Sequence, residues 1–341
     1  MVWNLITKHL NPRRNLVAEQ LRQLVESGRG NEVPERIPRM DRRHFNNSEH
    51  GLWHMLMGQI TFRQADYEAS LEHFRQGAEI CPEVESFELA RAQTYFFMER
   101  PAEAWACVYR FPVAELDTGW ALRLCHYAYL CSDYERGLWL VGILVERYRE
   151  AVNLDPSHLM ERGLPPFSFV WFTSAAFHKL AGRMDSMRRT TQQLERDCFN
   201  YDFELAWQDL DAAEHGDYAA LLRSVRAIRE EQRPLGVPLG FHDVSIAVFQ
   251  SFMAPSYRQA LGILEAVRIS EHDFPGLISI LRLARARVAH VHGEELQERM
   301  MANTFLNEYP MLVPAEVAFQ FGLLDYQETL KPRVRWMPLE A

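Results

Sequence analysis

The sequence predicts an all-α protein, and three observations carry that prediction. Amphipathic segments of about 12–16 residues, separated by very short breaks, follow one another from residue 48 almost to the end. Four tyrosines each follow a residue that is typical of helix starts, and small and large residues recur in phase at spacings of 33 or 34 residues. Together these features favour a stack of antiparallel helical hairpins, an α-solenoid.

The composition agrees with a folded chain. Its 341 residues are 48% hydrophobic and 24% charged, which is enough to bury a large core. No stretch approaches the roughly 18 consecutive apolar residues of a membrane-spanning helix, and no small-residue cleavage site follows the N-terminus. The five cysteines are odd in number and never form a C-x-x-C pair, which indicates reduced thiols. We therefore expect a soluble, unprocessed, cytoplasmic protein without membrane insertion.

The first 47 residues are predicted to form one helix and a basic arm. Asn11 and Pro12 suit the start of a helix, whose apolar face ends before Gly28, and residues 29–47 read as a connector. Residues 1–45 carry nine Lys/Arg against five Asp/Glu. Because acidic residues interrupt the arginines and no aromatic platform is interleaved, solvated or intramolecular contacts are favoured over nucleic-acid binding. The predicted apolar face consists of Leu16, Val17, Leu21, Leu24 and Val25.

The repeat is the most informative pattern. Small residues recur at two positions of the repeat, and large residues recur at a third. Antiparallel helices approach closely where one of them presents a small residue, and a bulky residue one turn later fills the space between them. The three sets are Gly58, Ala92 and Cys125; Ser70, Ala104 and Gly137; and Phe74, Val108 and Val141.

The residues from Trp53 to Pro82, with the small and large positions above, resemble the tetratricopeptide repeat (TPR). A capping residue precedes a helix-starting tyrosine at Asp66-Tyr67, Asp133-Tyr134, Asp217-Tyr218 and Ser256-Tyr257. The resemblance covers residues 48–150 and, with a weaker pattern, residues 200–310. It implies a right-handed superhelix. The pattern departs from the family where Leu116 and Arg149 replace the closing proline and where Pro112 shortens a helix.

Four segments follow from this pattern. They are an N-terminal helix and basic arm (1–47), TPR-like repeats (48–150), further hairpins continuous with the first (151–330) and a C-terminal tail (331–341). Longer loops are expected near 155–166 and 233–240, and residues 315–330 read as one closing helix. Trp336 in the tail could dock on the last repeat or be offered to a partner.

The resemblance also implies where a partner would bind, since the first helix of each hairpin lines the concave groove of such repeats. Lys/Asn clamps that hold chaperone tails are not matched, because Met55 and Gln59 stand at the corresponding places. An apolar groove with amide rungs suits an amphipathic helix or an extended apolar segment. The alternative is that these aromatic residues pack on a neighbouring helix or on the arm. The predicted lining is Leu52, Met55, Gln59 and Phe62; Leu89, Gln93, Phe96 and Phe97; and Leu122, His126 and Tyr129.

Candidate chemistry is sparse. His50 and His54 stand four apart, a spacing that can hold a metal ion, but no H-E-x-x-H is present and surface or packing histidines are commoner. No phosphate-binding loop or nucleophile elbow is visible, and no cofactor is expected. The sequence therefore favours a non-catalytic adaptor, scaffold or chaperone-like protein. The alternatives are an accessory subunit of a bacterial secretion or surface-assembly system and a metal-dependent enzyme using His50 and His54.

Overall fold

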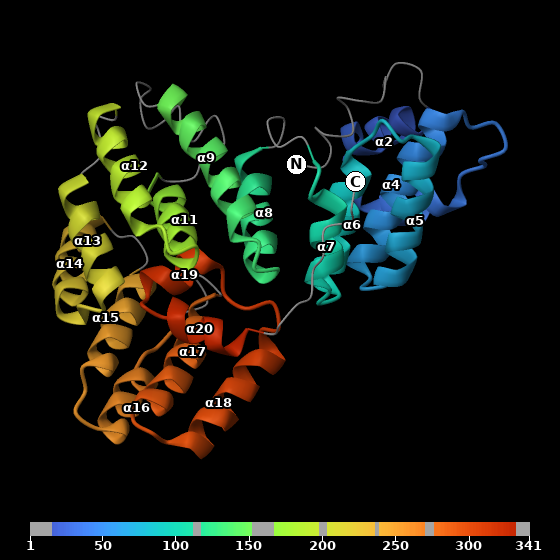
Figure 1. Cartoon of the computed structure of the whole chain (residues 1–341). Helices are drawn as coiled ribbons and strands as arrows, with labels where there is room; N and C mark the ends of the chain where they lie inside the picture. Colours follow the sequence, from blue (N-terminus) through green and yellow to red (C-terminus); the bar gives the residue numbers. More distant parts are fainter. Residues whose placement is uncertain are drawn as a thin grey trace. The chain divides into compact units, whose positions relative to one another are not determined.

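The computed structural model describes residues 16–111, 117–151, 167–197, 203–235, 239–269 and 276–331, and the predicted all-α class is confirmed for them (Figure 1). All regular structure in these ranges is helical. The described residues form two compact units, one up to residue 111 and the other from residue 117 to 331. The boundary between the units falls inside the range 48–150.

Unit 1 is a succession of helices in which α4 packs on α5, α5 on α6 and α6 on α7, while α2 packs on α4. Its elements are α2 (Leu16–Glu26), η2 (Gly30–Glu32), α3 (Val33–Arg36), η3 (Ile37–Arg39), α4 (Asn47–Arg63), α5 (Tyr67–Ile80), α6 (Ser86–Phe97) and α7 (Pro101–Val108).

Unit 2 begins with α8 (Thr118–Leu130), α9 (Tyr134–Ala151), α11 (Phe167–Leu180) and α12 (Met184–Asp197). It continues with α13 (Phe203–His215), α14 (Tyr218–Gln232), η5 (Arg233–Leu235), α15 (Gly240–Phe252) and α16 (Tyr257–Glu265). Its last helices are α17 (Gly276–Val291), α18 (Glu295–Glu308), α19 (Ala315–Gln320) and α20 (Leu324–Leu330).

One buried carboxylate organises the start of unit 1. Glu49 is 3% exposed, and its side chain accepts hydrogen bonds from the backbone N–H of Asn46, which caps α4, and from that of Leu16, where α2 begins. Helix starts leave N–H groups without intrahelical partners, so this carboxylate satisfies donors at two helices. The predicted start of the first helix at Pro12 lies outside the described residues.

The connector after α2 folds into short helical turns rather than an extended arm. Ile37 is 1% exposed, and its carbonyl accepts a hydrogen bond of 2.9 Å from Trp53 Nε1 on α4. The Arg42 guanidinium stacks 4.1 Å from the centre of the Trp53 ring. In the described part of the arm, arginine and acidic side chains also pair with one another, as Arg43 and Asp41 do at 2.6 Å. The described part of the arm thus makes intramolecular contacts, one of the two kinds that the sequence favours, although pairs such as Arg43 and Asp41 are also exposed.

The helical hairpins share one turn geometry. In seven of the described turns, a residue with φ between 58° and 71° is followed by one residue whose N–H bonds the carbonyl five positions earlier, and the next helix then begins. This pattern satisfies the last carbonyls of the first helix. The positive-φ residues are Ala65, Glu99, Ser132, Gly182, Gly216, Gly293 and Gly322.

The four predicted tyrosine helix starts are confirmed. Helices α5, α9, α14 and α16 begin at Tyr67, Tyr134, Tyr218 and Tyr257. In each case the preceding Asp or Ser side chain accepts a hydrogen bond from a backbone N–H in the first turn. The short polar side chain before each tyrosine therefore fixes where the second helix of the hairpin starts.

In the first hairpin, the predicted small and large positions are in contact. A β-carbon added to Gly58 would lie 2.4 Å from Phe74 Cε1, and the Ser70 hydroxyl donates a hydrogen bond of 2.8 Å to the Gly58 carbonyl. Gly137 on α9 approaches Phe177 on α11 as closely, since a β-carbon there would lie 2.0 Å from Phe177 Cε1. Ala92 and Ala104 are fully buried.

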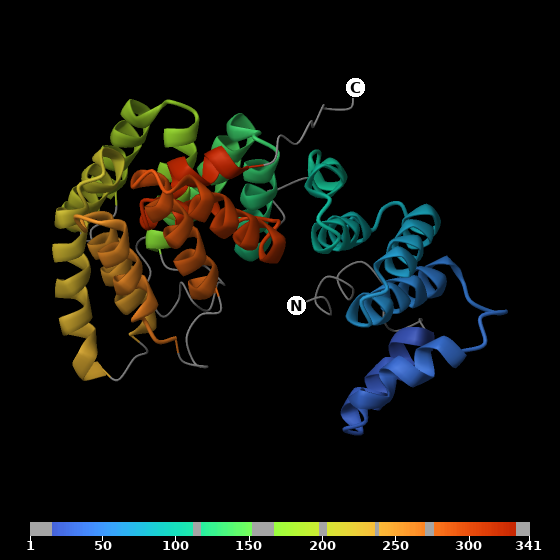
Figure 2. The same ribbon diagram turned by 90° about the horizontal axis from the view of Figure 1, so that it is seen from below.

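The single closing helix predicted over residues 315–330 is wrong. Gly322 takes a φ of 64° and ends α19, and α20 starts two residues later. Both short helices turn back, so that α19 packs on α11 and α20 bonds side chains of α8 and α9. Figures 1 and 2 show these red helices beside the green α8 and the yellow-green α11. The ends of unit 2, about 200 residues apart, are therefore joined.

Candidate partner-binding surface

The predicted groove residues are divided between the two units. The first two sets, on α4 and α6, belong to unit 1, and the third, on α8, belongs to unit 2. Leu52, Met55 and Leu89 are at most 2% exposed and form part of the core. Because their side chains are covered by neighbouring helices, they support the hairpins from inside and offer no contact area to a partner in this structure.

The accessible aromatic residues of the predicted lining, Phe62, Phe96 and Phe97, form an aromatic patch together with Tyr67. The Phe62 ring meets Phe97 edge-on, with centroids 5.0 Å apart, and also contacts Tyr67 at 5.5 Å. Phe97 is 51% exposed, while the other three side chains are partly buried. Aromatic rings gathered at the surface offer large apolar contact area with little conformational freedom to lose on binding.

Amide side chains stand one helical turn before two of these rings. Gln59 precedes Phe62 on α4, and Gln93 precedes Phe96 on α6, and both glutamines are partly exposed. Each glutamine can donate and accept hydrogen bonds. The patch and its amides thus combine apolar area with polar groups that could orient a bound segment. Tyr67 belongs to this patch but was predicted only as a helix start.

In unit 2 one residue of the third set, Tyr129, is already covered by the same chain. Tyr129 is fully buried, and its hydroxyl accepts a hydrogen bond of 2.9 Å from Gln327 Nε2 on α20. His126 stacks on Tyr129 with centroids 6.2 Å apart, and burial lowers the pKa of His126 to about 4. Leu122 is partly buried. No local motif in the sequence singles out Gln327, which lies 198 residues from Tyr129.

The histidines of α4 are arranged differently from the predicted pair. His54 is 6% exposed, and its Nδ1 lies 3.2 Å from Nδ1 of His73 on α5, whereas the His50 ring packs against Phe45. Burial and the neighbouring His73 lower the pKa of His54 to about 4. Neither His50 nor His54 belongs to a group of three or more metal-ligating side chains among the described residues.

Such a group occurs in unit 2, at Asp211, Glu214 and His215. Arg188 donates hydrogen bonds to Asp211 Oδ1 at 3.1 Å and to Glu214 Oε2 at 2.5 Å. The guanidinium therefore already neutralises both carboxylates. His215 also borders a hollow of about 220 Å³ whose other charged lining includes Lys179 and Asp325, which pair at 2.8 Å.

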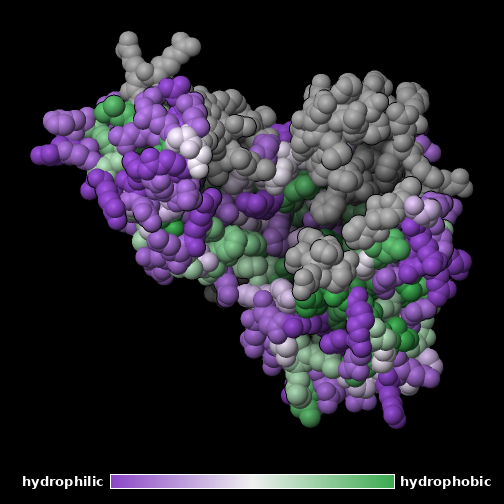
Figure 3. Space-filling model, turned by 180° about the vertical axis from the view of Figure 1, so that it is seen from behind, coloured by the Kyte–Doolittle hydropathy of each residue, from purple (hydrophilic) through white to green (hydrophobic). Residues whose placement is uncertain are grey.

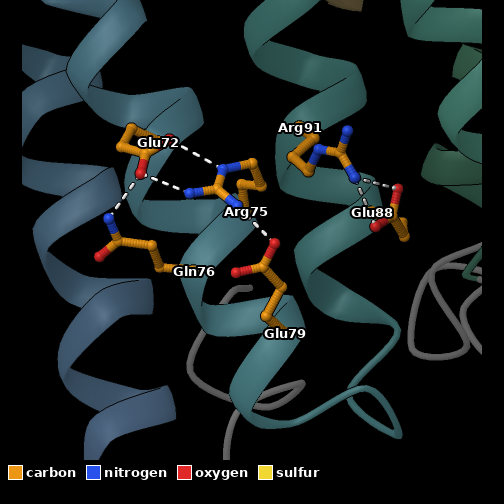
Figure 4. A network of polar contacts seen from close by, with 6 residues as sticks. All are labelled: Glu72, Arg75, Gln76, Glu79, Glu88 and Arg91. Carbon is orange, nitrogen blue, oxygen red and sulfur yellow. Dashed lines mark hydrogen bonds and ion pairs between the residues drawn. The ribbon is translucent and has the colours of Figure 1, made fainter.

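On α5 and α6 of unit 1, charged side chains pair within their own helices. Figure 4 shows Arg75 between Glu72 and Glu79 on α5, with Gln76 on Glu72, and Arg91 paired with Glu88 on α6. Arg75 and Gln76 lower the pKa of Glu72 to about 2. Exposed pairs of this kind contribute little to stability. They do not create a surface of a single charge sign here.

The comparisons with known proteins give no relative. No protein-family model, curated protein or solved structure matches the chain. Among the described residues, no helix is both long and apolar enough to cross a membrane. The face in Figure 3 is a mixture of hydrophilic and hydrophobic areas, and single exposed apolar residues such as Trp139 and Met253 are ordinary on protein surfaces.

Proposed function

We propose that this chain is a non-catalytic protein-interaction module, an adaptor, scaffold or chaperone-like protein, which binds an amphipathic helix or extended apolar segment of a partner protein. Its surface for that partner is the aromatic patch of unit 1 together with Gln59 and Gln93. In the same proposal, the hairpins are TPR-like and follow a right-handed superhelix. The recurrence of positive-φ turn residues at Ala65, Glu99 and Ser132, 34 and 33 residues apart, supports the repeat.

The observation that carries this proposal is the contact of α20 with α8. Tyr129 of the third lining set has a helix against it, and the contact uses a buried side-chain amide of that helix, Gln327. Gln59 with Phe62 and Gln93 with Phe96 repeat the spacing of His126 with Tyr129, one polar and one aromatic residue three positions apart. A surface of the same type in unit 1 therefore suits a helix with an apolar face.

The test compares affinity capture by the wild type and two charge variants. Phe97→Glu places a carboxylate in the aromatic patch, while Leu296→Glu changes a residue that is 69% exposed on α18 of unit 2. We expect both variants to keep their helical circular dichroism, and only Phe97→Glu to lose the partner that the wild type retains. A photocrosslink from position 97 would then identify the bound segment. Retention of the same partner by folded Phe97→Glu would rule out this surface.

A further inference from the structure

The end of α20 is held in a cage formed by the turn between α8 and α9. The Lys331 ammonium lies 4.3 Å from the centre of the Tyr129 ring and 5.0 Å from that of Tyr134. It donates hydrogen bonds to the Tyr129 carbonyl and, at 3.2 Å, to the Tyr134 hydroxyl. The Lys331 side chain is only 5% exposed. Two aromatic faces and two oxygen acceptors thus surround one ammonium group.

The same helix completes the cage with a carboxylate. Glu328 lies 3.5 Å from the Lys331 ammonium and accepts a hydrogen bond of 2.6 Å from the Tyr134 hydroxyl. Burial lowers the pKa of Lys331, and Glu328 opposes that effect. An ammonium over aromatic rings is attracted to them, more strongly where water is excluded. The turn between α8 and α9 is therefore built to hold a lysine that directly follows the last residue of a helix, as Lys331 follows Leu330.

The helix that fills this site has little stability of its own. α20 has seven residues, and its N-cap, Leu323, forms no side-chain cap. Gly322, in the left-handed conformation, directly precedes Leu323. Isolated helices need roughly 12–15 residues to be even marginally stable in water. The helical state of α20 therefore depends on its contacts with α8, α9 and the segment around Val313.

We propose that the face of α8 that carries Tyr129, together with the α8–α9 turn, forms a second helix-binding site. The helix α20 is an internal, exchangeable ligand of this site. The partner that displaces α20 is an amphipathic helix with the same pattern, a glutamine followed four positions later by a lysine, as in Gln327 and Lys331. The glutamine meets Tyr129, and the lysine enters the cage of Tyr129 and Tyr134. This inference rests on the proposed function and adds its regulation, because unit 2 binds only when α20 leaves.

Hydrogen exchange of the unmodified protein gives the first test. If α20 is exchangeable, its amides exchange through a local opening, faster than those of α8 and α9 and without their exposure. Exchange of α20 only together with α8 and α9 would show that it is an inseparable part of unit 2 and would overturn the proposal. This outcome is independent of the aromatic patch in unit 1.

Binding of a peptide in trans gives the second test. The probe is a fluorescent peptide with the sequence of residues 318–331, offered to the full-length wild type and to a Lys331→Ala variant. Because the wild-type site is mostly occupied, we expect the variant to bind the probe roughly tenfold more tightly or better. A probe that itself carries alanine for the lysine should lose this gain.

Each result decides between the alternatives. A folded variant that binds the probe no better than the wild type overturns the proposal. If Lys331→Ala does not fold, hydrogen exchange of the wild type decides alone. Since Phe97→Glu leaves α8 and α20 unchanged, a Phe97→Glu chain with Lys331→Ala should still bind the probe. The exchange of α20 and the function of the unit 1 surface can thus fail separately.

Discussion

At the scale of single residues, two glycines of α9 separate the effect of packing from that of helix propensity. A β-carbon on Gly137 would lie 2.0 Å from Phe177 Cε1, and Phe177 is fully buried. A β-carbon on Gly142, five residues later on the same helix, would meet nothing within 4 Å. The close approach at Gly137 is therefore a tertiary requirement, whereas Gly142 only weakens the helix.

We expect Gly137→Ala and Gly142→Ala to change stability in opposite directions. Overpacking against Phe177 should lower the free energy of unfolding by about 1–3 kcal/mol. Gly142→Ala should raise it by roughly 0.5–1 kcal/mol, because alanine is the better helix former. Urea denaturation followed by circular dichroism measures both changes. Equal effects of the two substitutions would show that α9 and α11 are less tightly packed at this point than the structure has them.

The facing rings of His54 and His73 predict a loss of stability in acid. The pKa of His54 is about 4 in the folded protein, against an ordinary value of 6.5, so the folded state binds fewer protons than the unfolded state between these values. The contribution of His54 is thus fully present above about pH 6.5 and is lost as the pH falls towards 4. The charges and titratable groups that act on the pair are Arg42, His50, Asp66 and Glu72.

We therefore expect the urea midpoint of the wild type to fall between pH 7 and pH 4.5 more steeply than that of His54→Gln, which cannot take up this proton. Titration of the histidine ring protons by NMR measures the pKa directly. A ring at position 54 that titrates near 6.5 would contradict the effect of burial beside His73.

At the scale of elements, the hairpin turns place L-residues in a conformation that favours glycine. Ala65 has a φ of 60° between α4 and α5, and the left-handed region costs an L-residue roughly 1 kcal/mol or more. Within a helix, by contrast, alanine is more stable than glycine. The exposed Ala106 on α7 offers the comparison in the same unit.

We expect Ala65→Gly to stabilise unit 1 by about 1 kcal/mol and Ala106→Gly to destabilise it by roughly 0.5–1 kcal/mol. Both alanines are exposed, so neither change opens a cavity. Thermal unfolding of the two variants beside the wild type gives the comparison. A loss of stability in both would mean that the turn at Ala65 does not need a left-handed residue.

Local chemistry explains which elements the sequence could predict. Capping residues before Tyr67 and Tyr134 act within one turn, and the small-to-large spacing of Gly58 and Phe74 acts within one hairpin, so both can be read from sequence. The burial of Leu52 and Leu89 could not, because it depends on which neighbouring helix covers each face. The break at Gly322 could not be predicted either, since the apolar periodicity continues across it.

At the scale of the whole molecule, the feature that sequence periodicity could not predict is the joining of distant segments within unit 2. Gln327 is fully buried, and its amide bonds the Tyr129 hydroxyl and both the N–H and the carbonyl of Val313. A side chain on α20 thus connects α8 to the segment before α19. Such contacts arise only after the chain has brought its ends together, and a repeat pattern carries no information about them.

A double-mutant cycle measures this joining directly. Gln327→Leu leaves the N–H and carbonyl of Val313 without a partner in the interior, which should cost about 1–3 kcal/mol, while Tyr129→Phe removes one hydrogen bond and should cost about 0.5–1.5 kcal/mol. Because the two side chains bond each other, the double variant should lose less than the sum, with a coupling of at least about 0.5 kcal/mol.

The control cycle pairs Gln327→Leu with Ser251→Ala. The Ser251 hydroxyl bonds the Val248 carbonyl within α15 and shares no partner with Gln327, so additive effects are expected. Urea unfolding of the four chains in each cycle supplies the free energies. Additivity in both cycles would mean that α20 and α8 are not energetically joined in solution. Coupling in the first cycle alone would show that a hydrogen bond between residues 198 positions apart helps to hold unit 2 closed.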